Sequence, residues 1–123
     1  MINQFNELRV LNEAHKFTLK IYKLIKIFPP EEKFRLIDQV CRSASSVPAN
    51  IVEGNCRKTT KEFVQFLYQA KGSLSETQYH LLLAKDLQII KIDTFNELIF
   101  ESDEIGKMIS GLISYLKNKT STI

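Results

Sequence analysis

Few side chains in this sequence of 123 residues are spaced as a catalytic group would be. Ser73, Glu76 and His80 follow one another at intervals of three and four residues, which places them on one face of a helix. A hydroxyl, a carboxylate and an imidazole within hydrogen-bond reach can supply a nucleophile and its base. Within a single helix, however, this spacing is weak evidence for a catalytic triad. We therefore predict no catalytic residues and a protein that is not an enzyme.

The patterns that hold metals, cofactors or phosphates are also missing. The two histidines, His15 and His80, do not form the paired Glu-x-x-His motifs of a di-iron bundle. Cys41 and Cys56 lie fifteen residues apart without the nearby second ligands of a zinc site. We expect both thiols in the core, although a disulfide remains possible. No glycine-rich phosphate loop is present, so the sequence predicts neither a metal nor a cofactor.

Four cationic side chains near the N-terminus recur at intervals of seven, four and three residues, on a helix face opposite the apolar one. They are Arg9, Lys16, Lys20 and Lys23. Residues 1–30 hold five Lys or Arg and two Glu, an excess of +3 that equals the net charge of the whole chain. Because lysine contacts phosphates without reading bases, this basic strip is a candidate surface for RNA or DNA. The alternative is a solvated helix face without a ligand.

A second polar group lies on one side of residues 31–56 at near-helical spacing. It comprises Arg35, Arg42, Ser46, Glu53 and Arg57, with Asn50 nearby. These side chains could bind a phosphate, pair across a subunit boundary, or form a polar network inside one bundle. Glu53 would oppose an anion, so we favour a structural or assembly role.

Apolar residues also occur opposite the main apolar faces of the third and fourth segments. They are Tyr68, Gly72, Tyr79 and Leu83 in the third, and Phe100, Met108 and Tyr115 in the fourth. A bundle helix buries one face, so a second apolar face predicts a subunit interface. Gly72 would then permit close approach of two helices. Scattered surface aromatics are the alternative.

The elements that carry these residues are predicted to be helices throughout. Apolar residues recur with helical spacing, and only four glycines and three prolines are present. We predict one domain, residues 1–123, with helices at about 5–27, 31–56, 60–88 and 94–118. Thr59 with Glu62, and Thr94 with Glu97, read as capping boxes at helix starts. Short connections predict an antiparallel up-down-up-down four-helix bundle.

Finer expectations concern the buried faces, a bend and the compartment. The first helix is expected to bury Leu11, Ala14, Thr18, Ile21, Tyr22 and Ile25. Pro48 lies inside the second apolar stripe, which stays in phase beyond it, so we expect a kinked and uninterrupted helix. The N-terminal residues lack the apolar core of a signal peptide. No run approaches about eighteen apolar residues. We therefore expect a cytoplasmic protein without a membrane span.

Residues 41–87, beginning CRSASSVPANIVEGN, resemble the bacterial four-helix bundle family named after proteins encoded in intervening sequences of 23S ribosomal RNA genes. The residues that carry the resemblance are Arg42, Ser46, Pro48, Asn50, Ile51, Glu53, Gly54, Glu62, Phe63, Leu67, Ala70, Gly72, Ser73 and Glu76. The flanking helices fit as well, and the resemblance spans roughly residues 5–118. Val52 departs from the pattern, in which alanine is common, and changes packing volume without changing chemistry.

The resemblance implies a bundle that assembles into a homopentamer and has no established enzymatic activity. It also implies a remote likeness in fold to the accessory variability determinant of diversity-generating retroelements, which binds nucleic acid and a reverse transcriptase. That likeness transfers by analogy only. We therefore expect a non-enzymatic oligomer that binds nucleic acid or a nucleic-acid-associated protein, with a structural or protein-interaction oligomer as the alternative. The partners expected are further copies of this chain, with RNA or DNA and a nucleic-acid-processing protein as candidates.

Overall fold

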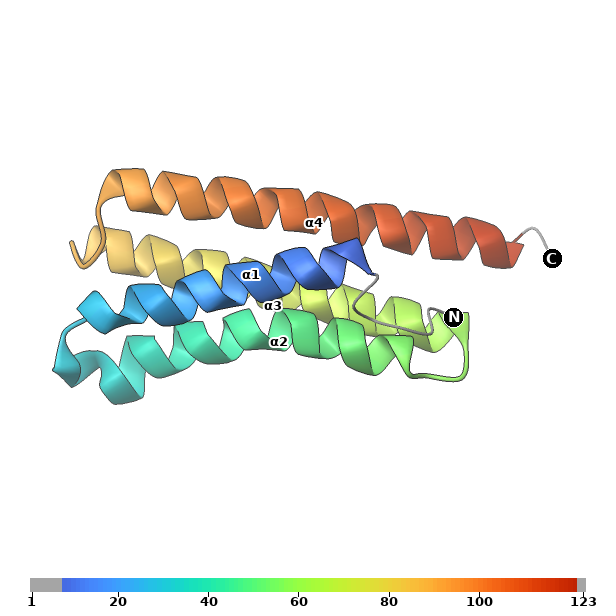
Figure 1. The fold of residues 1–123 in the computed structure, drawn as a ribbon, viewed down its shortest axis with the longest axis horizontal. Coiled ribbons are helices and arrows are strands. Elements are labelled where there is room, and N and C mark those ends of the chain that lie inside the picture. The colour runs from blue at the N-terminus through green and yellow to red at the C-terminus, as the bar shows by residue number, and fades with distance from the viewer. Residues whose placement is uncertain (1–7, 122–123) are drawn as a thin grey trace.

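The computed structural model describes residues 8–121, with side chains through residue 119, and this part of the chain forms four long helices (Figure 1). The helices are α1 (Arg9–Leu24), α2 (Asp38–Asn55), α3 (Thr60–Asp86) and α4 (Ile92–Ser121). Figure 1 shows that successive helices run in opposite directions along one long axis. α1 and α3 each pack against both α2 and α4. The predicted all-α four-helix bundle is confirmed.

The connection between α1 and α2 is helical along most of its length. It consists of two 3₁₀ turns, η2 (Ile25–Ile27) and η3 (Pro30–Glu32), followed by a π-helical segment, η4 (Lys33–Ile37). Pro30 stands at the start of η3, where a missing backbone N–H costs nothing. The helix expected from residue 31 therefore begins with a tight turn and a wide turn before it becomes regular.

The two predicted capping boxes differ in outcome. At the start of α3, Thr59 Oγ1 accepts a hydrogen bond of 3.1 Å from the backbone N–H of Glu62, which confirms the threonine half of this capping box. The cap at Thr94 is wrong, because α4 already begins at Ile92. The backbone N–H of Phe95 donates to the carbonyl of Lys91, which closes the first turn before Thr94 is reached.

The core is a single cluster along the bundle axis. Large side chains that are almost fully shielded from solvent come from each helix, and they include Ile21, Ile51, Phe63, Leu67, Leu81 and Ile109. Tyr22 was expected in this core but is 47% exposed, whereas Phe17 is buried. Phe17 lies on the side of α1 that faces α4, whereas Tyr22 lies outside the buried side of this helix. Cys56 also proves exposed, because it follows the last residue of α2, while Cys41 packs against the core; both thiols are free.

α2 runs without interruption through Pro48, as expected. Proline has no backbone N–H, so the carbonyl of Ala44 loses its usual partner one turn later. The hydroxyl of Thr18 on α1 lies 3.2 Å from that carbonyl and 2.8 Å from the carbonyl of Ala14. A side chain of the neighbouring helix thus reaches the acceptor that Pro48 leaves open. The bend at Pro48 stays a prediction.

Within the described residues, none of the helices combines the length and the apolar character needed to cross a bilayer.

Candidate functional site

The four cations of the basic strip are all exposed on α1, and three of them, Lys16, Lys20 and Lys23, lie beside α4. Lys20 Nζ forms an ion pair with a carboxylate oxygen of Glu101 across the α1–α4 seam. Lys16 Nζ lies 3.9 Å from Glu13 within α1. The strip predicted from the sequence is therefore bordered by carboxylates from its own helix and from α4.

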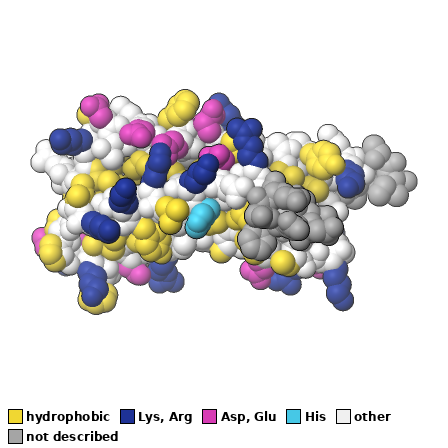
Figure 2. All heavy atoms as spheres, viewed as in Figure 1, with side chains coloured by type: hydrophobic (Ala, Val, Ile, Leu, Met, Phe, Trp, Pro, Cys, Tyr) yellow, Lys and Arg dark blue, Asp and Glu magenta, His cyan; other side chains and the backbone are white. Residues whose placement is uncertain are grey.

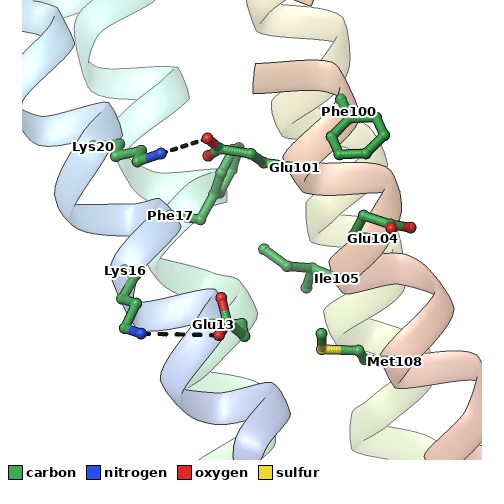
Figure 3. Close-up of a pocket in the computed structure, with 9 residues that line it drawn as sticks. All are labelled: Glu13, Lys16, Phe17, Lys20, Phe100, Glu101, Glu104, Ile105 and Met108. Carbon is green, nitrogen blue, oxygen red and sulfur yellow. Dashed lines mark hydrogen bonds and ion pairs between the residues drawn. The ribbon is translucent and has the colours of Figure 1, made fainter. Parts of the chain in front are cut away.

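A groove lies between α1 and α4 (Figure 3). Its volume is about 260 Å³, and Phe17, Ile105 and Met108 contribute apolar surface to it. Charged or aromatic side chains complete the lining, and they are Glu13, Lys16 and Lys20 from α1 with Phe100, Glu101 and Glu104 from α4. Figure 3 shows the Lys20–Glu101 pair spanning the gap between the two helices. The groove thus offers an apolar interior and a border of both charges.

The electrostatics of this groove are mixed rather than basic. The hydrogen bond from Lys20 to Glu101 raises the pKa of the ammonium group above its ordinary value; desolvation opposes this rise, and the charges of Glu101, Glu97 and Glu13 add to it. Figure 2 shows cationic and acidic side chains intermingled on the face that carries α1 and α4. Carboxylates this close to the lysines repel an approaching phosphate. The arrangement therefore suits a polypeptide with charges of both signs better than a nucleic acid backbone.

The second apolar faces of α3 and α4 lie largely in solvent. Tyr68, Tyr79, Phe100 and Tyr115 are 44%, 57%, 67% and 60% exposed. A methyl group added at Gly72 would meet nothing within 4 Å, so the space beside this glycine is open in the single chain. Leu83 and Met108 differ from the rest, since both pack partly against the core.

Of the arginines predicted on one face of the second helix, Arg42 lies in α2, Arg35 lies in η4 and Arg57 follows the end of α2; each is near a carboxylate three or four residues away. The pairs are Arg35–Glu32 at 3.7 Å, Arg42–Asp38 at 3.6 Å and Arg57–Glu53 at 2.8 Å. Asn50 donates instead to the backbone carbonyl of Ser46 at 2.8 Å and to its hydroxyl at 3.0 Å. The structure thus places the arginines in local pairs on the surface, while Asn50 joins a separate set of hydroxyl groups.

These hydroxyls connect α2 with α3. Ser73 donates to Ser46 Oγ at 2.9 Å, and Thr77 lies 2.8 Å from Ser43 Oγ and 2.9 Å from the carbonyl of Ser73. Sequence reasoning named Ser46 and Asn50 as candidates for a polar network, but it did not identify their hydroxyl partners Ser43, Ser73 and Thr77. A polar depression of about 270 Å³ opens beside it, lined in part by Arg42 and Glu76.

The structure does not assemble the trio of Ser73, Glu76 and His80 into a triad. Glu76 lies 3.3 Å from His80 Nε2, but Ser73 bonds to Ser46 on the neighbouring helix. The hydroxyl is therefore engaged away from the imidazole. Among residues 8–121, no group of three or more potential ligands gathers to hold a metal ion.

Sequence reasoning also missed an exposed aromatic residue in the α1–α2 connection. Phe34 is 86% exposed, more than any other large hydrophobic residue that the structure describes. The amino group of Lys33 lies 5.4 Å from the centre of its ring. An apolar residue next to a turn motif was the available signal, but helical periodicity alone did not separate it from the core.

Comparison with known proteins agrees with this architecture. Residues 6–111 match the family described as 23S rRNA-intervening sequence protein. A crystal structure of a protein with unknown function from the S23 ribosomal protein family of Bacteroides thetaiotaomicron is similar, with 28% sequence identity and a TM-score of 0.79. The similarity covers 85% of this chain and 97% of that one. No match was found among curated proteins.

Proposed function

The chain belongs to the 23S rRNA-intervening sequence protein family, and we propose that it works as a self-associating protein-interaction module without catalytic activity. The observation that carries this proposal is the outward apolar surface of α3 and α4. Phe100 and Tyr115 on α4 are 67% and 60% exposed, although the core is already filled by other residues. Exposed aromatic side chains of this size are typical of interfaces. The homopentamer implied by the family resemblance is the assembly we propose.

The mass of the protein in solution tests self-association. Light scattering is expected to return several times the 14.2 kDa of one chain. Replacing Tyr79 and Phe100 by serine should lower that mass, because both side chains would lose their burial against a partner. Leu87→Ser is a matched control, since Leu87 is 54% exposed but lies in the α3–α4 turn. A parent mass of one chain would refute the proposal.

Gly72 supplies a second test of the same proposal. Leucine at this position fits the single chain, because the space beside Gly72 is open. If two copies approach each other there, Gly72→Leu lowers the mass of the assembly while leaving helicity unchanged. An unaltered mass would move Gly72 out of the interface.

A second candidate function is weak binding of RNA or DNA through the basic strip. The observation in its favour is that Arg9, Lys16, Lys20 and Lys23 are all exposed along one helix. The neighbouring carboxylates lower the affinity expected for nucleic acid, because phosphates must approach Glu13 and Glu101 as well. A nucleic-acid-processing protein as partner remains part of this candidate.

Fluorescence anisotropy with labelled RNA, single-stranded DNA and duplex DNA tests this second candidate. Lys16→Gln with Lys23→Gln should weaken binding and reduce the slope of log affinity against log salt by about 1 to 2. Lys20 stays unchanged because it pairs with Glu101. Lys58→Gln with Lys61→Gln removes the same charge near the α2–α3 turn and serves as the control. A parent that binds none of the three probes at about 50 mM salt eliminates this candidate.

A further inference from the structure

Phe34 projects from one end of the bundle and has little contact with its own chain. Its side chain belongs to the π-helical segment η4, where it is 86% exposed. Two residues later, Leu36 is buried at 4% exposure. The wide π turn therefore anchors Leu36 in the core while it leaves Phe34 outside. π-helical turns are energetically unfavourable and occur often at functional sites, so this geometry suggests an aromatic residue held out for a partner.

The groove between α1 and α4 has room for such a ring. An enclosed apolar cavity of about 150 Å³ holds benzene; this groove is open on one side and has a volume of about 260 Å³, so a phenyl ring fits within it. Its apolar lining comes from Phe17, Ile105 and Met108. Phe34 of the same chain cannot occupy it, since that ring is in solvent. The chain thus carries both an exposed phenyl group and an unfilled groove suited to one.

The charges around the two features are complementary. Acidic residues Glu31 and Glu32 precede Phe34, and basic residues Lys33 and Arg35 flank it. The groove presents Lys16 and Lys20 beside Glu13 on its α1 wall, and Glu101 and Glu104 on its α4 wall, so the α1 wall carries a net positive charge and the α4 wall a negative one. A bound η3–η4 segment can therefore place its acids toward α1 and its bases toward α4. Paired charges of this kind fix the orientation of a docked segment.

We infer that Phe34 of one copy inserts into the α1–α4 groove of a second copy of this chain. The inference rests on the proposed self-association and names its contact. The α1–α2 connection, which carries Phe34, lies at one end of the bundle (Figure 1). The groove is lined by residues of α1 and α4, so each copy uses two different surfaces. A contact of this type is heterologous and generates a ring when the rotation between copies closes.

Removing the phenyl ring is the direct test. Phe34→Ser should reduce the light-scattering mass from that of the assembly to that of one chain, because the groove loses its occupant. Leu87→Ser is the matched control, since it removes another exposed apolar side chain without touching η4 or the groove. A parent that assembles while Phe34→Ser keeps the full mass overturns the inference and leaves self-association intact. A parent that is a single chain overturns both.

Mixing two defective variants tests the pairing of ring with groove. Phe34→Ser lacks the ring but keeps the groove; Glu104→Lys with Met108→Lys spoils the groove but keeps the ring. Each variant alone is expected as a single chain, and an equimolar mixture is expected to form a complex of two chains. Circular dichroism and urea unfolding establish that both variants fold; if the lysine pair does not, Glu104→Lys alone replaces it. Folded variants that stay apart when mixed overturn the inference.

Discussion

Gln88 adopts a backbone conformation that its side chain makes costly. Its φ of 63° lies in the left-handed region, directly after the end of α3. The N–H of Gln88 donates to the carbonyl of Lys85, and that of Ile89 donates to the carbonyl of Ala84. These two bonds form a Schellman motif, in which glycine is usual at the position of Gln88. Because glutamine at this position does not signal a helix end, the apolar pattern predicted the end of α3 only to within two residues.

Glycine at position 88 should stabilise the protein. Gln88→Gly relieves the left-handed strain at the end of α3, and we expect the free energy of unfolding to rise by about 1 kcal/mol. Gln88→Asn should give part of that gain, because asparagine tolerates the same region, and Gln88→Ala should give none. Urea unfolding monitored by circular dichroism measures the three changes. A glycine variant no more stable than the alanine variant would contradict this account.

Two glycines of the bundle should respond to alanine in opposite directions. A methyl group at Gly54 would lie 2.7 Å from Phe66 Cβ and 2.9 Å from Phe63 Cδ1, so α2 and α3 must move apart. We expect Gly54→Ala to cost about 1 to 3 kcal/mol of folding free energy. Gly111→Ala meets nothing within 4 Å in α4 and should gain about 0.5 to 1 kcal/mol. Equal effects in urea unfolding would show that Gly54 is not a packing glycine.

At the scale of elements, the beginnings of α2 and α4 differ from those predicted from the sequence, and the predicted beginning of the first helix at residue 5 lies outside the described residues. Thr59 could be predicted as the N-cap of α3 because it follows directly after a turn. Thr94 has the same motif, but α4 begins two residues earlier, at Ile92, where the chain leaves the α3–α4 turn. η4 carried no sequence signature, because a π turn reflects the packing of Leu36 rather than local preference. Capping motifs are therefore reliable only where no earlier residue can close the first turn.

The contact between α1 and α2 at Pro48 leads to a prediction about coupled residues. Thr18→Val removes the hydroxyl near the Ala44 carbonyl, and we expect a loss of about 1 to 2 kcal/mol in folding free energy. In a Pro48→Ala background, the new alanine would supply the missing N–H, so the same substitution should cost about 1 kcal/mol less. A double-mutant cycle by urea unfolding measures this coupling. Thr77→Val is the control, because its partners are Ser43 and Ser73. Additive effects at Thr18 and Pro48 would disprove the link.

At the scale of the whole molecule, the sequence predicted which residues of one helix share a candidate surface, but not which residues of other helices border it. The basic strip follows from the spacing within α1, but its acidic neighbour Glu101 is 81 residues away from Lys20 along the chain. Only the fold brings the two together. The same holds for Met108 and Phe17, which meet in the groove from different helices. Periodicity predicts which face of a helix is polar, and it does not predict which charges of another helix border that face.

Self-association should make stability depend on protein concentration. If the folded chains assemble and the unfolded chains do not, mass action favours the folded state as concentration rises. Each tenfold rise should then add up to about 1.4 kcal/mol per chain to the free energy of unfolding. Thermal unfolding at several concentrations measures this as a rising midpoint. Phe34→Ser should remove most of the concentration dependence, whereas Leu87→Ser should retain it. A parent midpoint that is constant over a hundredfold range would show that folding and assembly are uncoupled, and the apolar residues on α3 and α4 would then be isolated surface aromatics.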